Sequence, residues 1–164
     1  MQEQANPHDV PRGIEASRKT PAHRTSIKAF ENHLMTVKEA RDFATHTLRA
    51  WGVTARVEDI RLCVSELTTN ALAHGTVAGQ GFVVQMKAAP GMLRIEVHDS
   101  SSCRPELREP EDTDTSGRGL LLITVLSDDW GIEDRQPFGK IVWSVFKLGE
   151  SPVAFECEPR RGPS

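Results

Sequence analysis

Two stretches of the chain carry apolar residues at helical spacing. Between Thr36 and Gly52 they recur every three or four positions, which predicts an amphipathic helix. Thr36 and Glu39 have the spacing of a capping box, so the helix is expected to have its N-cap at Thr36. A second helix is predicted from Thr54 to about His74. Its apolar stripe consists of Ile60, Cys63, Val64, Leu67 and Ala71.

Shorter segments with alternating apolar and polar positions predict strands. They cover residues 26–34, as a short edge strand, and residues 82–88, 92–99, 130–134 and 140–148. A short apolar helix is expected to follow Gly119 and to end near Leu126. Strands in runs, with helices grouped between them, predict a two-layer α/β (α+β) sandwich. Its sheet is expected to be mixed but mostly antiparallel, with helices on one face.

Both ends of the chain lack this periodicity. Residues 1–26 and 150–164 are rich in proline and charge, which predicts a disordered arm and tail around one domain, residues 27–149. Residues 103–116 are long, polar and without periodicity, as in an active-site lid or a disordered loop. No internal repeat is present.

Composition narrows the functional classes. The chain has 164 residues, 38% hydrophobic and 26% charged, with a formal net charge of −3. This acidic balance argues against direct nucleic-acid binding, and no apolar run is long enough for a membrane span or a signal peptide. A cytoplasmic location is therefore expected. Cys63, Cys103 and Cys157 have unrelated spacings, which favours neither a disulfide framework nor a zinc site.

Polar residues at three places suggest chemistry. Glu66, Asn70 and His74 are four residues apart, so they form a row beside the apolar stripe, although such a row is also typical of a solvated face. Asp99 continues the inward phase of its strand, unless it has already left the strand to cap the following turn. Gly117 and Gly119 open a helix, where backbone amides can bind an anion.

Together these segments resemble the motifs of the GHKL, or Bergerat-fold, ATPases. The stretch from Glu66 to Gly75 resembles the N-box, and His98 to Ser101 resembles the first glycine box in its anti-sigma variant. Residues 117–120 resemble the second glycine box. The three motifs occur in the family's order, and they are most similar to the anti-sigma-factor serine/threonine kinases of the RsbW type. Gly139, Lys140, Val142 and Trp143 are similar to that branch too, whereas Ser101 and Cys103 replace glycines of the wider family.

The resemblance implies a role for each matching residue. Asp99 would recognise adenine, helped by Ser101, and Asn70 would be the ligand of Mg²⁺ on ATP. Glu66 would be the general base toward a serine or threonine hydroxyl. His74 would lie at the nucleotide. The phosphate end would be lined by Gly117, Arg118, Gly119 and Leu120.

The resemblance also implies partners. The kinase would phosphorylate an anti-anti-sigma protein of the STAS type and would sequester a sigma factor, and homodimerisation would be compatible with the family. Two other functions stay open at this point. One is an ATP-binding regulatory module with little turnover. The other is a detached histidine-kinase ATP-binding domain, which the absence of a periodic, histidine-bearing dimerisation helix disfavours.

Overall fold

Five strands form one antiparallel sheet, and buried positions alternate mainly along its central strands. The computed structural model describes residues 23–75, 80–101 and 118–149. The spatial order of the strands in this part of the chain is β1-β2-β3-β5-β4, and every pairing is antiparallel. The strands are β1 (Arg24–Phe30), β2 (Phe82–Ala89), β3 (Met92–Asp99), β4 (Asp129–Asp134) and β5 (Lys140–Lys147).

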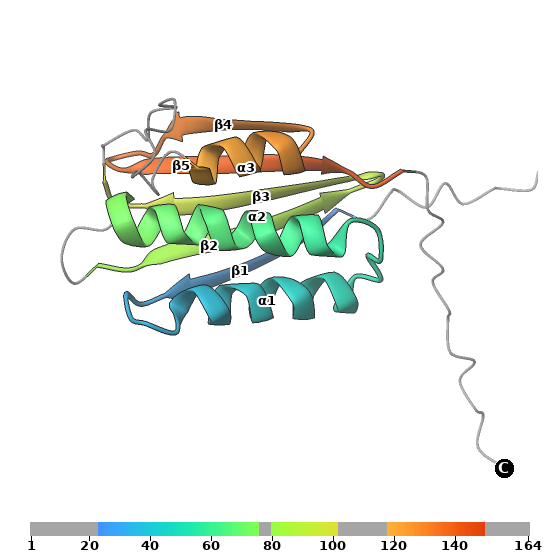
Figure 1. The fold of residues 1–164 in the computed structure, drawn as a ribbon, viewed down its shortest axis with the longest axis horizontal. Coiled ribbons are helices and arrows are strands. Elements are labelled where there is room, and N and C mark those ends of the chain that lie inside the picture. Colours follow the sequence, from blue (N-terminus) through green and yellow to red (C-terminus); the bar gives the residue numbers. More distant parts are fainter. Residues whose placement is uncertain (1–22, 76–79, 102–117, 150–164) are drawn as a thin grey trace, which may run out of the picture.

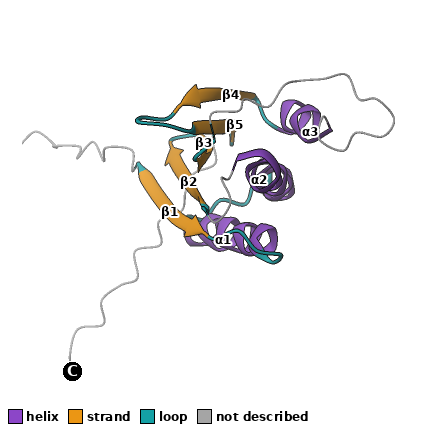
Figure 2. Cartoon of the chain, turned by 90° about the vertical axis from the view of Figure 1, so that its left-hand side faces the viewer, coloured by secondary structure: helices purple, strands orange, loops and turns teal. Residues whose placement is uncertain are grey.

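Three helices cover one face of this sheet (Figures 1 and 2). They are α1 (Thr36–Ala50), α2 (Val57–Asn70) and α3 (Arg118–Leu126), and a π-helical turn, η1 (Ala71–Gly75), continues α2. The helix α2 packs between α1 and α3 and also contacts β3 and β5. The predicted two-layer sandwich with helices on one face is confirmed.

The predicted apolar stripe of α2 forms the centre of the core. Ile60, Cys63, Val64, Leu67 and Ala71 are each at most 2% exposed. They pack against the inward residues of the central strands, because every second residue of a strand points to the same face. Those inward residues include Val84, Met86, Leu93, Ile95, Val97, Val142 and Phe146.

The first helix starts differently from the prediction. Thr36 is the first helical residue, and the N-cap is Met35, whose side chain makes no capping hydrogen bond. The Thr36 hydroxyl donates to the Glu31 carbonyl at 2.6 Å and accepts from the His33 amide at 3.1 Å. Thr36 therefore closes the preceding turn, and the expected capping box with Glu39 is wrong.

The second helix is shorter at both ends than predicted. Arg56 adopts a left-handed conformation with φ 58°, so regular helix begins only at Val57. At the other end α-helical geometry stops at Asn70, and residues 71–75 form the wider π turn. The first strand is also shifted, since it begins at Arg24 and ends at Phe30, although it is an edge strand as expected.

The other face of the sheet carries a charged cluster around Glu96. The Glu96 side chain is 5% exposed and lies 2.7 Å from Arg94 Nε, 2.9 Å from Lys87 Nζ and 2.9 Å from His98 Nε2. Burial alone raises the pKa of Glu96, but the hydrogen bonds from these three neighbours outweigh it and lower the pKa to about 2. Arg94 also lies over the Trp143 ring, 4.4 Å from its centroid.

Two further expectations meet the structure only in part. Cys63 is fully buried, donates a hydrogen bond to Ser144 and has its pKa raised to about 12 by burial. Cys103 and Cys157 lie outside the described residues. The ranges that the structure does not describe are 1–22, 76–79, 102–117 and 150–164. Across the ranges that the structure describes, no helix has the length and apolarity that a membrane span requires.

Candidate functional site

The three segments that carry the candidate functional residues lie together at one end of the sheet. The C-terminal end of α2, the N-terminal end of α3 and the C-terminal end of β3 all lie at the same side of the domain (Figure 1). The turn η1 packs against β3, and α2 packs against α3. This arrangement follows from topology, because α2 and β3 run toward this end while α3 and β5 start from it.

Gly119 brings α3 directly against the polar edge of α2. A Cβ at Gly119 would be 2.9 Å from Glu66 Oε2 and 3.3 Å from Asn70 Oδ1. Only a residue without a side chain fits there unless the two polar groups move. The structure thus places Glu66, Asn70 and Gly119 in one constellation, although they come from segments about fifty residues apart.

Glu66 and Asn70 lie at the border of the core. Both side chains are half-buried, whereas the apolar stripe beside them is fully buried. Desolvation by burial raises the pKa of Glu66, so its carboxylate is more basic than that of an ordinary exposed glutamate. Within the described residues, no hydrogen-bond partner is found for the buried Asn70 Nδ2.

Asp99 is the last residue of β3 and is 1% exposed. Lys140 Nζ lies 3.0 Å from Oδ1 and 2.9 Å from Oδ2, and the Ser101 amide donates to Oδ1 at 3.0 Å. Asp99 therefore lies inward on the strand and also accepts a bond from the turn that follows. Burial raises its pKa, while Lys140 and the Ser101 amide act in the opposite direction.

Two buried polar atoms without a hydrogen-bond partner among the described residues lie at the same end of the domain. In the described ranges, Ser100 Oγ joins Asn70 Nδ2 as a buried side-chain atom without a hydrogen-bond partner. Buried polar atoms are normally satisfied, but Arg61 Nε and Trp143 Nε1 are also unpartnered elsewhere in the described chain. The two atoms at this end therefore support a ligand site only together with the geometry around Gly119.

The remaining predicted residues differ in how exposed they are. His74 is exposed on η1, where the wider winding interrupts its alignment with Glu66 and Asn70. Arg118 is exposed at the start of α3, but the side chain of Leu120 belongs to the core. Gly117 lies outside the described residues.

Sequence reasoning missed Lys140 as the partner of Asp99. The lysine is 3% exposed and shares the inward phase of Val142, Ser144 and Phe146 on β5. This phase was visible in the sequence, and a buried lysine requires a counter-charge. The pairing itself depends on the register of β3 with β5, in which Asp99 lies opposite Lys140.

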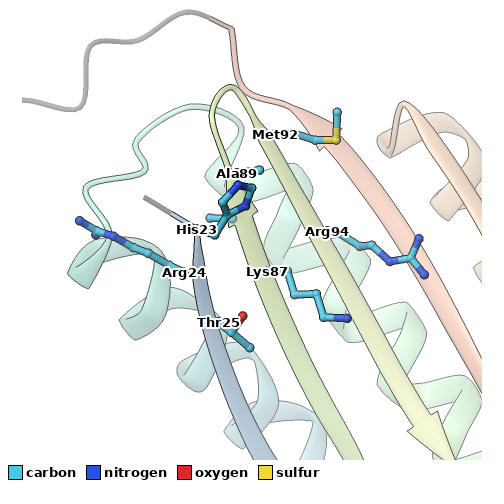
Figure 3. A pocket seen from close by; sticks show the side chains of 8 residues that line it. His23, Arg24, Thr25, Lys87, Ala89, Met92 and Arg94 are labelled. Atoms are coloured by element: carbon cyan, nitrogen blue, oxygen red, sulfur yellow. The ribbon is translucent and has the colours of Figure 1, made fainter. Parts of the chain in front are cut away.

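A separate hollow lies at the opposite end of the sheet (Figure 3). Its cationic residues include Lys87 and Arg94, which already form ion pairs with Glu96. It is therefore not part of the constellation around Glu66. Its lining consists of His23, Arg24, Thr25, Lys87, Ala88, Ala89, Met92 and Arg94.

No cluster of three or more His, Cys, Asp or Glu side chains that could hold a metal ion occurs in the described segments. Mg²⁺ on a nucleotide needs much less, because it keeps waters and phosphate oxygens and takes one or two protein oxygens.

A protein-family model and a solved structure are similar to this chain. The family model described as "Histidine kinase-like ATPase domain" matches residues 30–146. Among solved structures, the chain is similar to the histidine kinase domain from the Erythrobacter litoralis EL346 blue-light activated histidine kinase, with 23% identity and a TM-score of 0.43. The match covers 74% of this chain and 66% of that one, just under two thirds of its length. No curated protein matches the chain.

Proposed function

The chain belongs to the histidine kinase-like ATPase family, and from this membership we propose that it is an ATP-dependent protein serine/threonine kinase of the anti-sigma type. The observation that carries the proposal is the contact of Gly119 with Glu66 and Asn70. It puts a carboxylate, a carboxamide and the first turn of a helix around one point. A phosphoryl-transfer site needs these three kinds of group.

Glu66 is the proposed general base. It accepts the proton of a serine or threonine hydroxyl while the hydroxyl oxygen bonds to the γ-phosphorus of ATP and the bond to the β,γ-bridging oxygen breaks, which releases ADP. A base works best when its pKa lies near the working pH, and burial raises the pKa of Glu66 in that direction. The arrangement therefore suits proton transfer better than an exposed glutamate would.

The residues fit a magnesium ion that accompanies the nucleotide. Asn70 offers an amide oxygen, a hard ligand, and its unpartnered Nδ2 can donate to a phosphate oxygen. When bound, Mg²⁺ neutralises charge on the phosphates. In this proposal Asn70 holds the ion, Gly119 and the exposed Arg118 lie toward the phosphates, and Leu120 contributes only its backbone there. His74 borders the nucleotide from η1.

Asp99 is the proposed adenine-binding residue. A carboxylate accepts hydrogen bonds only, so it selects a base that presents an amino group. Ser101 fixes this carboxylate through its backbone amide at 3.0 Å. The unpartnered Ser100 hydroxyl is a second polar group available at the base end.

The proposed partners are proteins. The kinase would phosphorylate an anti-anti-sigma protein of the STAS type, and this modification would free the kinase to bind a sigma factor. The proposal places the chain in the cytoplasm, where transcription occurs. Dimerisation of two such chains is compatible with it.

The test measures transfer of label from γ-labelled ATP to purified STAS-domain proteins, with wild type and Glu66→Gln. Acid-stable label on a serine or threonine that disappears in the variant supports the proposal. Acid-labile label would indicate phosphohistidine and would contradict it. Unchanged binding to the partner, with no label transferred by either protein, would favour the ATP-binding regulatory module.

A further inference from the structure

The buried pair of Asp99 and Lys140 is more than a pair of charges. Both residues lie at the end of the inward rows of their strands, and they are directly opposite one another in the register of β3 with β5. Their exposed fractions are 1% and 3%. Lys140 Nζ lies within 3.0 Å of each carboxylate oxygen and 3.5 Å from the Ser101 carbonyl.

Stability alone does not account for this pair. Taking two charges out of water costs about as much as their attraction returns, and well-packed apolar residues often serve a core equally well. The next inward pair along the same two strands is apolar, since it consists of Val97 and Val142. The charges at the end of the rows therefore call for a reason beyond packing.

Gly139 makes the close approach of the two strands possible. It has φ +99°, and a Cβ at this position would lie 2.1 Å from the Asp99 carbonyl oxygen. With glycine, the start of β5 lies directly against the end of β3. This contact fixes the backbone of Lys140 beside Asp99. The Lys140 ammonium is therefore already positioned close to the Asp99 carboxylate.

The described residues do not use every hydrogen-bond acceptor position of the Asp99 carboxylate. Each carboxylate oxygen has about two lone-pair positions. Oδ1 accepts from both Lys140 and the Ser101 amide, whereas Oδ2 is approached only by Lys140 among the described residues. One acceptor position on Oδ2 is therefore available for the amino group of a ligand.

We propose that Lys140 is a positioning residue, which holds the Asp99 carboxylate charged and in one orientation so that Oδ2 accepts the exocyclic amino group of adenine. This role rests on the proposed nucleotide function. The charged groups that act on Asp99 from neighbouring elements of the described chain are Lys140 on β5 and Arg135 in the β4–β5 connection. Lys140 is the one in contact, so its loss leaves a buried acid with little compensation.

The test compares binding of ATP with binding of purine riboside triphosphate, which lacks the amino group, by calorimetry at about pH 6 and about pH 8. The ratio of the two dissociation constants reports recognition of the amino group. Wild type is expected to prefer ATP on the order of tenfold at both pH values, because a hydrogen bond to a charged group contributes that much. Lys140→Met is expected to lose most of this preference at the lower pH and to regain part of it at the higher pH.

Controls separate positioning from folding. Lys140→Arg keeps a positive charge beside Asp99 and is expected to retain the wild-type preference at both pH values. The double variant Asp99→Asn with Lys140→Met removes both charges, and its ratio is expected to be low and independent of pH. If Lys140→Met does not fold, Lys140→Gln, which keeps a donor without charge, is expected to show the same pH dependence.

A folded variant without the lysine charge that keeps the wild-type ratio at both pH values overturns the inference. This failure is distinct from failure of the proposed function, in which wild type itself would bind neither triphosphate.

Discussion

Replacing Gly119 by alanine tests the central contact of the site with a single methyl group. The new Cβ would be 2.9 Å from Glu66 Oε2, whereas ordinary contact begins at 3.4 Å, so the carboxylate has to move by about 0.5 Å. Asn70 Oδ1, at 3.3 Å, has to move less. The group that yields is the end of a flexible side chain, so the fold is expected to tolerate the change.

Stability and activity are expected to move in opposite directions. Gly119 lies in the first turn of α3 without a positive φ, and alanine favours a helix over glycine by up to about 1 kcal/mol. The melting temperature is therefore expected to stay equal or to rise. Misplacement of a catalytic group by 1 Å can cost about a hundredfold, so a shift of half that size is expected to slow phosphoryl transfer on the order of tenfold.

The assay combines label transfer from γ-labelled ATP with thermal unfolding, for Gly119→Ala, Glu66→Ala and the double variant. If the methyl acts through Glu66, Gly119→Ala has little further effect once the carboxylate is gone. Leu122→Ala, at an exposed position of the same helix, is the matched control and should leave transfer unchanged. Transfer within about twofold of wild type in a folded Gly119→Ala protein would show that Gly119 does not set the position of a catalytic Glu66.

Three other variants test separate parts of the account. Transfer by wild type is expected to rise with pH through the pKa of Glu66, which burial raises above its ordinary value. Glu66→Gln should lose this rise and about a hundredfold or more in rate, and a rise that persists in the variant contradicts the assignment. Glu96→Gln should lower the free energy of unfolding at pH 7 by about 2–3 kcal/mol, because the pKa of Glu96 is lowered to about 2 in the folded protein. This stabilisation is fully present above the ordinary pKa of a glutamate and is lost as the pH falls through about 2, and equal urea midpoints for both proteins at pH 7 would exclude it. Arg56→Ala should lower the free energy of unfolding by about 2 kcal/mol, because Arg56 donates to the Leu126 carbonyl and pairs with Asp128. An unchanged urea midpoint would show that these two bonds contribute nothing to stability.

The parts of the fold that follow from local periodicity were predictable. The apolar stripe of α2 and the polar edge with Glu66 and Asn70 depend only on helical geometry over a few turns. The inward position of Asp99 depends only on alternation along one strand. For this reason the sequence alone could indicate the residues of the candidate site.

The features that depend on distant contacts were not predictable in the same way. Lys140 meets Asp99 because two strands forty residues apart pair in one register. Thr36 bonds the preceding turn instead of capping its helix, although both uses suit a threonine. Neither the left-handed Arg56 nor the π turn after Asn70 has a local signal in the sequence. Arg56 also bonds to Asp128 and to the Leu126 carbonyl, which are distant along the chain.

Titration with ATP, with and without Mg²⁺, tests the convergence of the three segments most directly. It compares wild type, Asn70→Ala and Asp99→Asn, with a melting curve for each protein. Asp99→Asn is expected to lose most of its affinity for ATP in either condition, and Asn70→Ala is expected to lose the part of the affinity that depends on Mg²⁺. Equal affinity and equal dependence on Mg²⁺ in all three folded proteins would contradict the assignment of this end of the sheet as a nucleotide site.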